Sequence, residues 1–291
     1  MKKINNFLPL ITPFDYKLNI DYLSLEKILF YINNLENLNN IILFDNISEY
    51  KTFTDNEYID IINCIYNNNK NNLNIILKIN NFYNYYDLIN ILNKTIYKNI
   101  YSFILDFPKN LNNYEYNKDI INNYNKIFNY FKYLKFYFFI KNDININLLI
   151  ELKKKNKNFI GIIINNKNLI KNIKLIKYFK IIVYNDLLIF NNLNFNIYGI
   201  FSPLYYFFLN YINNITLNFY KKNFFLIDNN FYKFINLINI LYNKIYYISG
   251  IKYLLYNLNI CEYYTKKPIN NIKHIKEYNK LKKLFKIIIN N

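Results

Sequence analysis

Eight short apolar segments, each followed by a longer amphipathic one, constrain the fold of this chain more than any other feature. The apolar segments are rich in Ile, Leu, Val and Phe, and they comprise Phe7–Thr12, Asn40–Phe44, Asn74–Ile79, Ser102–Phe107, Lys135–Lys141, Phe159–Ile164, Lys180–Tyr184 and Ile197–Ser202. Continuous apolar runs of this length are typical of parallel strands that are buried on both faces. Eight alternations of strand and helix predict an α/β fold, a closed (β/α)₈ TIM barrel.

The segments between the predicted strands carry helix signals. Tyr22–Asn33 has apolar residues at helical spacing, and Glu115–Tyr133 is a longer segment of the same kind. Asp87 is expected to open a further helix. Thr54 and Glu57 form the pattern of a capping box, so we expect a helix to begin at Asp55.

A helical pattern runs from Pro203 to the end of the sequence. We assign residues 1–222 to the barrel and residues 223–291 to a C-terminal helical appendage, within which Gly250 and Pro268 are expected to separate the helices. No linker or shift in composition marks a boundary, so the appendage is not expected to be an independent domain.

The composition is strongly biased: the chain has 33 Tyr, 26 Phe and only 3 Gly, and it contains no Trp and no Arg. We interpret this bias as the product of an AT-rich genome, as in a reduced bacterial endosymbiont. The formal net charge of +18 would normally suggest a nucleic acid or an anionic membrane as partner. Here the positive charge is all lysine and scattered, and arginine, the better residue for phosphate contacts, is absent. We therefore expect neither partner. Nucleic-acid binding is kept only as a third possible function, behind the two described below.

Residue counts exclude several classes of site. Cys64 and Cys261 make neither a disulfide framework nor a metal site, and we expect no metal and no cofactor. His274 is the only histidine, which excludes triads and zinc sites built from several histidines. No signal peptide and no transmembrane segment are predicted, so we expect a cytoplasmic protein.

In a barrel of this kind functional groups lie at the C-terminal ends of the strands. The polar residues at or just after those ends include Thr12, Asp45, Asn46, Lys78, Asn80, Asp106, Lys141, Asn142, Asn165, Asn185, Asp186 and Ser202. Such a rim suits a small anionic substrate. Any barrel places polar residues there, so the rim alone does not indicate catalysis.

Several segments resemble the dihydrodipicolinate synthase / N-acetylneuraminate lyase family. Residues 10–14 (LITPF) look like the first-strand signature of that family, and residues 41–57 run in register with its second strand, its GTTGE turn and the following helix start. Further matches are Pro108 after the fourth strand, residues 159–161 in the sixth, residues 198–202 in the eighth, and Lys252 and Pro268. The resemblance covers nearly the whole chain, and two of its three glycines fall on family positions.

The resemblance implies an enzyme that works through a covalent imine. In the family a lysine on the sixth strand condenses with pyruvate, and a tyrosine on the fifth strand relays protons. The resemblance further implies a small pyruvate-like substrate and a homo-oligomer, a tetramer in the family. Within the family, 4-hydroxy-tetrahydrodipicolinate synthase, which condenses pyruvate with aspartate semialdehyde in lysine biosynthesis, is preferred over the sialic acid lyase.

The sequence departs from the family at the residues that carry this chemistry. Ile163 occupies the position of the imine-forming lysine, and Phe139 that of the tyrosine. The two threonines of the turn correspond to Asn46 and Ile47, and no arginine is present to bind a second carboxylate. Thr12, Asn46, Ile47, Phe201 and Ser202 remain as expected substrate-binding positions, Phe201 through its main chain.

Two readings of function follow. The first is a family enzyme, and the second is a catalytically inactive family member that is kept as a binding or structural subunit, or a decaying gene. An imine at a relocated lysine would favour the first reading, and Lys141 and Lys78 are the candidates. Lys141 is preferred over Lys78, because it shares strand parity with Phe139.

Overall fold

The structure is a computed structural model. It describes residues 4–79, 85–95, 100–107, 114–140, 146–165, 169, 177–184, 186, 197–221, 229–243, 247–267, 269 and 275–289. The chain forms two compact units, one of residues 1–7, 40–43 and 74–201 and one of residues 8–39, 44–73 and 202–291. The boundary expected at residue 222 stays a prediction.

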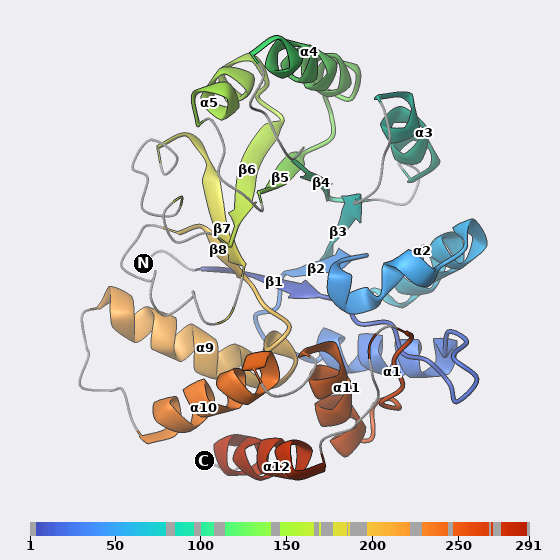
Figure 1. The fold of residues 1–291 in the computed structure, drawn as a ribbon, viewed down its shortest axis with the longest axis vertical. Helices are drawn as coiled ribbons and strands as arrows, with labels where there is room; N and C mark the ends of the chain where they lie inside the picture. The colour runs from blue at the N-terminus through green and yellow to red at the C-terminus, as the bar shows by residue number, and fades with distance from the viewer. Residues whose placement is uncertain are drawn as a thin grey trace. The chain divides into compact units, whose positions relative to one another are not determined.

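The first unit is built on a closed parallel barrel, which confirms the predicted fold class (Figure 1). Its strands follow one another around the barrel in chain order, and β8 pairs with β1 to close it. They are β1 (Asn5–Pro9), β2 (Asn40–Leu43), β3 (Asn74–Ile79), β4 (Ser102–Asp106), β5 (Phe136–Ile140), β6 (Phe159–Ile164), β7 (Lys180–Tyr184) and β8 (Gly199–Phe201).

Helices α3 (Tyr85–Thr95), α4 (Tyr114–Tyr130) and α5 (Ile146–Lys155) lie outside the strands of this unit (Figure 1). Aromatic side chains join α4 to the sheet: the Tyr124 ring meets that of Phe138 edge-on at 4.7 Å between centroids. All five residues of β5 are buried, because outward-pointing rings such as that of Phe138 are covered by helices while inward-pointing ones fill the barrel.

Gly161 on β6 shows why glycine persists in a chain that has so few. A β-carbon at this position would lie 2.4 Å from the carbonyl oxygen of Lys180 and 2.8 Å from the ring of Tyr137. The Tyr137 side chain therefore occupies the space that any larger residue at position 161 would need.

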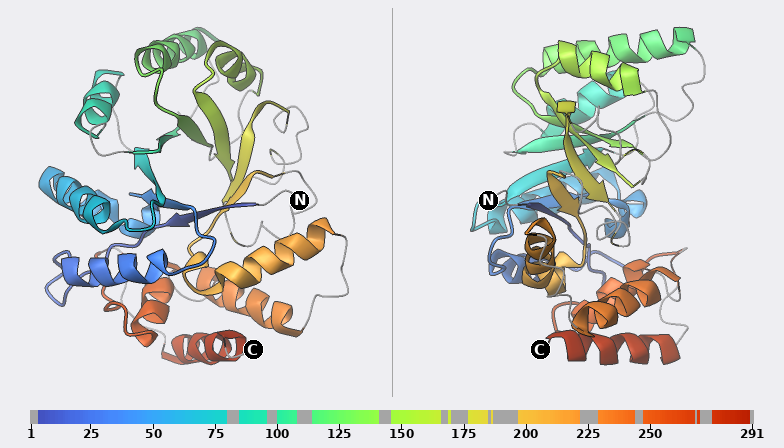
Figure 2. Two further views of the ribbon diagram at one scale, coloured as in Figure 1. Left: turned by 180° about the vertical axis from the view of Figure 1, so that it is seen from behind. Right: turned by 90° about the vertical axis from the view of Figure 1, so that its left-hand side faces the viewer.

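The second unit contains α1 (Tyr22–Asn33), α2 (Asp55–Asn68), α9 (Tyr205–Tyr220), α10 (Asn229–Asn243), α11 (Tyr247–Asn257) and α12 (Ile275–Ile289). Helices α10 and α12 run side by side, as both views in Figure 2 show. The Asn33 side chain at the end of α1 donates to the carbonyl oxygen of Asn68 at the end of α2, at 2.9 Å. The predicted capping box is confirmed: Thr54 accepts from the Glu57 backbone N–H, and the Glu57 carboxylate accepts from that of Thr54.

Some expected element bounds were wrong. β1 ends at Pro9 rather than Thr12, because a proline has no N–H with which to continue the pairing. Gly250 does not break the C-terminal segment but lies inside α11, where glycine costs only about 1 kcal/mol relative to alanine. Pro108, Pro268 and His274 fall outside the described residues. Within the described residues, no helix is long and apolar enough to cross a membrane.

Candidate functional site

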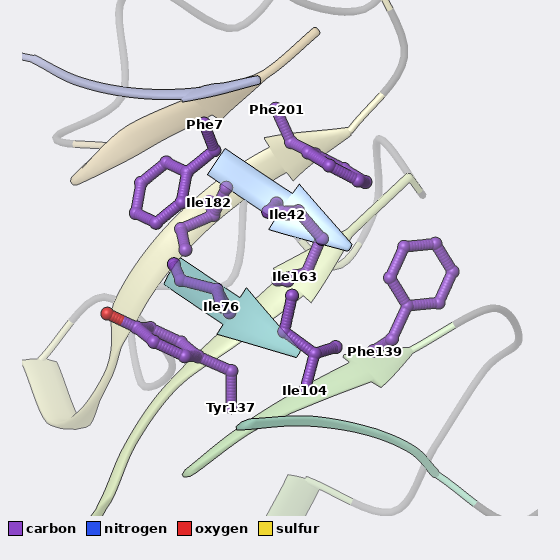
Figure 3. Packing of buried hydrophobic residues seen from close by; sticks show 9 residues of the cluster. All are labelled: Phe7, Ile42, Ile76, Ile104, Tyr137, Phe139, Ile163, Ile182 and Phe201. Atoms are coloured by element: carbon purple, nitrogen blue, oxygen red, sulfur yellow. The ribbon is translucent and has the colours of Figure 1, made fainter. Parts of the chain in front are cut away.

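The interior of the barrel is filled by one cluster of buried side chains (Figure 3). All are at most 2% exposed, and they come from every strand: Phe7, Ile42, Ile76, Ile104, Tyr137, Phe139, Ile163, Ile182 and Phe201. Most are hydrocarbon. Burial raises the pKa of the Tyr137 hydroxyl, with smaller contributions from Tyr198 and Tyr101, so Tyr137 is a neutral phenol at any physiological pH.

Ile163 lies in this interior cluster and is fully buried. On β6 it is aligned with Phe139 of β5 and with Ile182 of β7. An aliphatic side chain has neither a nucleophilic atom nor an exchangeable proton. The position that the family resemblance assigns to the imine-forming lysine therefore cannot form an imine in this chain.

Phe139 lies among aromatic rings in the same interior. Its ring meets that of Tyr184 edge-on, with 5.2 Å between centroids, and the Tyr184 ring lies 4.8 Å from that of Phe201. Sequence reasoning missed Tyr184, although strand parity could have found it: Tyr184 lies two residues after the inward-pointing Ile182. Tyr184 places a phenol near Phe139, which cannot itself transfer a proton.

Among the described residues, Lys78 is a buried lysine on a barrel strand. It is 2% exposed, and its ammonium nitrogen lies 4.0 Å from the centroid of the Phe139 ring. Lys141, the preferred candidate of the sequence analysis, falls outside the described residues, as do Asn80, Asn142 and Asn185.

The loop after β2 belongs to the second unit and consists of two short 3₁₀ turns, η1 (Asn46–Ser48) and η2 (Tyr50–Thr52). Asn46 is exposed and Ile47 is buried. Between the turns, Glu49 adopts a left-handed backbone with φ of 58°. The Glu49 side chain is buried in the second unit.

Glu49 forms a buried ion pair with Lys252 of α11. The Lys252 ammonium donates to Glu49 Oε1 at 2.6 Å and to the carbonyl oxygen of Tyr264 at 2.8 Å. The other carboxylate oxygen accepts from the backbone N–H of Lys266 at 2.6 Å. Burial lowers the pKa of Lys252, and the Glu49 carboxylate opposes that effect. Both groups join the loop to α11 and to the segment that follows it, so this pair is structural.

Two further expected binding residues, Thr12 and Ser202, are also buried in the second unit. The Ser202 hydroxyl accepts from the backbone N–H of Leu204 at 3.0 Å, just before α9 begins. The structure thus brings Lys78, Phe139, Ile163 and Phe201 into one interior, whereas Thr12, Asn46, Ile47 and Ser202 belong to the second unit.

The described residues hold no cluster of three or more His, Cys, Asp or Glu side chains that could bind a metal ion. Cys64 and Cys261 are free thiols. Burial raises the pKa of the Cys261 thiol to about 12, so this cysteine is not a nucleophile at neutral pH.

Comparison with sequences gives limited support. No family model matches the chain. A curated 4-hydroxy-tetrahydrodipicolinate synthase of Karelsulcia muelleri is 42% identical over 78 residues, which is 26% of either protein. A segment that is 30% of the RNA polymerase subunit beta'' of Plasmodium falciparum is 35% identical over 303 residues. Both matches span less than a third of the curated relative. The second match covers 92% of this chain, but it carries no argument about function because a few residue types dominate this sequence.

Comparison with solved structures covers almost the whole chain. The 4-hydroxy-tetrahydrodipicolinate synthase of Methylacidiphilum fumariolicum superposes with a TM-score of 0.80 at 15% identity, over 99% of this chain and 98% of that one. The N-acetylneuraminate lyase of Proteus mirabilis superposes with a TM-score of 0.84 at 12% identity, over 99% of both chains. The chain therefore has the fold of the dihydrodipicolinate synthases and N-acetylneuraminate lyases, as its sequence resemblance predicts.

Proposed function

We propose that this chain is a highly diverged member of the dihydrodipicolinate synthase / N-acetylneuraminate lyase family and that it condenses pyruvate with aspartate semialdehyde. The 78-residue match to a curated 4-hydroxy-tetrahydrodipicolinate synthase carries this proposal, since it singles out the synthase rather than the lyase. The resemblance also supports an assembly of four identical chains, which light scattering would measure.

Fold similarity alone does not choose between these two activities. The solved synthase and the solved lyase superpose on the chain with similar TM-scores, 0.80 and 0.84. The interior offers a phenol at Tyr184 and an amine at Lys78, so acid–base and covalent chemistry remain available although Ile163 is inert.

A turnover assay with both substrates tests the proposal. The purified chain is incubated with pyruvate and aspartate semialdehyde, and the cyclic product is measured by mass spectrometry. The chain must be produced in a host that lacks its own synthase, so that no contaminating enzyme supplies the signal. We expect the product with the full chain and not with heat-denatured chain. Cleavage of N-acetylneuraminate without condensation would overturn the choice of the synthase.

The second candidate function is a non-catalytic barrel that binds a ligand or a partner chain. The buried Ile163 favours this candidate, because it removes the family's nucleophile while the surrounding fold is kept. Calorimetry with pyruvate separates the two: binding without any product in the turnover assay would support the non-catalytic barrel.

A further inference from the structure

Lys78 is a buried lysine on the third strand, with its ammonium nitrogen over the ring of Phe139. Lys78 is the fifth residue of β3, two residues after Ile76, which lies in the interior cluster. Side chains two apart on a strand face the same way, so Lys78 also points into the barrel, one step nearer the C-terminal end. Functional groups of such barrels lie at that end.

The surroundings of Lys78 combine an apolar wall with two groups that exchange protons. The ammonium nitrogen lies over the Phe139 ring, and the Tyr184 ring makes an edge-to-face contact with that same ring. Asp106 is aligned with Phe139 in the pairing of β4 with β5, and it lies two residues after the inward-pointing Ile104. An amine and a phenol thus lie against one aromatic ring, and an acidic residue is paired with that ring's residue on the neighbouring strand.

We infer that Lys78 is the catalytic amine of this barrel and that it forms an imine with a small α-keto acid. The inference rests on the proposed function for the identity of the substrate. Ile163 is the strand neighbour of Phe139, so the amine of Lys78 reaches the interior beside the inert sixth-strand position, but from β3.

The chemistry balances without any further reagent. The unprotonated amine adds to the keto carbon, and the carbonyl oxygen takes up a proton to give a carbinolamine. Loss of one water, with a proton donated to the leaving hydroxyl, gives the imine, and hydrolysis reverses both steps. Tyr184 and Asp106 are the groups placed to donate and accept these protons, and the apolar wall keeps bulk water away from the imine.

Trapping by reduction tests the inference. The full chain is incubated with pyruvate and sodium borohydride, which reduces an imine to a stable secondary amine, and is then digested for peptide mapping. We expect a mass increase of one reduced pyruvate on the peptide that contains Lys78, and no increase when pyruvate is left out. An unmodified chain, or an adduct on Lys141 or any other lysine, overturns the inference.

Two variants sharpen the result. Lys78→Met is expected to lose the adduct. Lys180→Met is the matched control. Lys180 also lies on a strand with its ammonium nitrogen over a ring, 4.6 Å from the centroid of Tyr198, but its side chain is exposed. The Lys180→Met variant is expected to keep the adduct. An adduct that persists in Lys78→Met contradicts the inference. Should Lys78→Met fail to fold, peptide mapping of the unaltered chain still decides.

The outcome is separable from that of the turnover assay. Product without an adduct on Lys78 would leave the proposed function intact and remove the role of Lys78. An adduct on Lys78 without condensation product would establish the amine and overturn the choice of substrates.

Discussion

Glu49 and Lys252 show how one residue pair joins distant parts of the chain. The two lie 203 positions apart, and both side chains are almost completely buried in the second unit. The Lys252 ammonium also lies 4.1 Å from the centroid of the Phe14 ring. Both charged groups have hydrogen-bonding partners, so the cost of burying them is offset only while both partners are present.

Removing one partner should therefore lower the free energy of unfolding much more than removing both. We expect Lys252→Met to lower the free energy of unfolding by about 3–5 kcal/mol, because it leaves a buried carboxylate without its counter-charge. The double variant Glu49→Gln, Lys252→Met should recover part of that loss. Urea unfolding measures both. A single variant as stable as the unaltered chain would show that the pair contributes nothing.

The position of Ile163 could be predicted from the sequence, whereas the burial of Lys78 could not. Alignment with the family placed Ile163, and strand parity predicts its direction. Strand parity also predicts the direction of Lys78. The sequence contains 37 lysines, however, and position on a strand does not distinguish a buried lysine from an exposed one. Burial depends on which rings surround the side chain, and that is decided by strands far apart in sequence.

At the scale of elements, the start of α2 depends on a local hydrogen-bonding pattern. Thr54, the N-cap, and Glu57, in the first turn, satisfy each other's backbone N–H groups. This device needs no distant partner.

We expect Thr54→Ala to lower the free energy of unfolding by about 0.5–2 kcal/mol, because the N–H of Glu57 loses its acceptor. Asn56→Ala, an exposed change in the same turn, is the control and should have little effect. Thermal unfolding followed by circular dichroism compares the two. Equal effects would mean that helix propensity, and not the cap, determines the result.

Elements that depend on local signals could be predicted from the sequence, and elements that depend on distant contacts could not. The bounds of α1, β3, β6 and β7 agree with the expected ranges, since apolar periodicity and caps are local signals. The end of β1 was missed although Pro9 is a local signal for it, and the continuity of α11 through Gly250 was missed because it depends on packing of the whole helix. The group around Lys78 was missed in part for the same reason, since Tyr184 meets Phe139 only when the barrel is closed.

At the scale of the whole molecule, the dominant property is an excess of positive charge. The sequence has 37 lysines and 19 acidic residues, for a formal net charge of +18. Among the described residues, the ion pairs of Lys252 with Glu49 and of Lys155 with Glu151 join opposite charges, and the second of these is exposed. Folding brings the remaining lysines closer together, so self-repulsion disfavours the compact state.

Screening this repulsion should stabilise the protein. Raising NaCl from about 0.01 M to about 0.1 M shortens the screening length from about 30 Å to about 10 Å, which weakens repulsion between exposed lysines while the buried Glu49–Lys252 pair is screened much less. We therefore expect the midpoint of thermal unfolding to rise over this range, and to rise equally with KCl, because screening depends on ionic strength rather than on the cation. A midpoint that falls with salt would mean that attractive surface pairs outweigh the net charge, and the scattered lysines would then have to be arranged around acidic partners rather than distributed as surface residues.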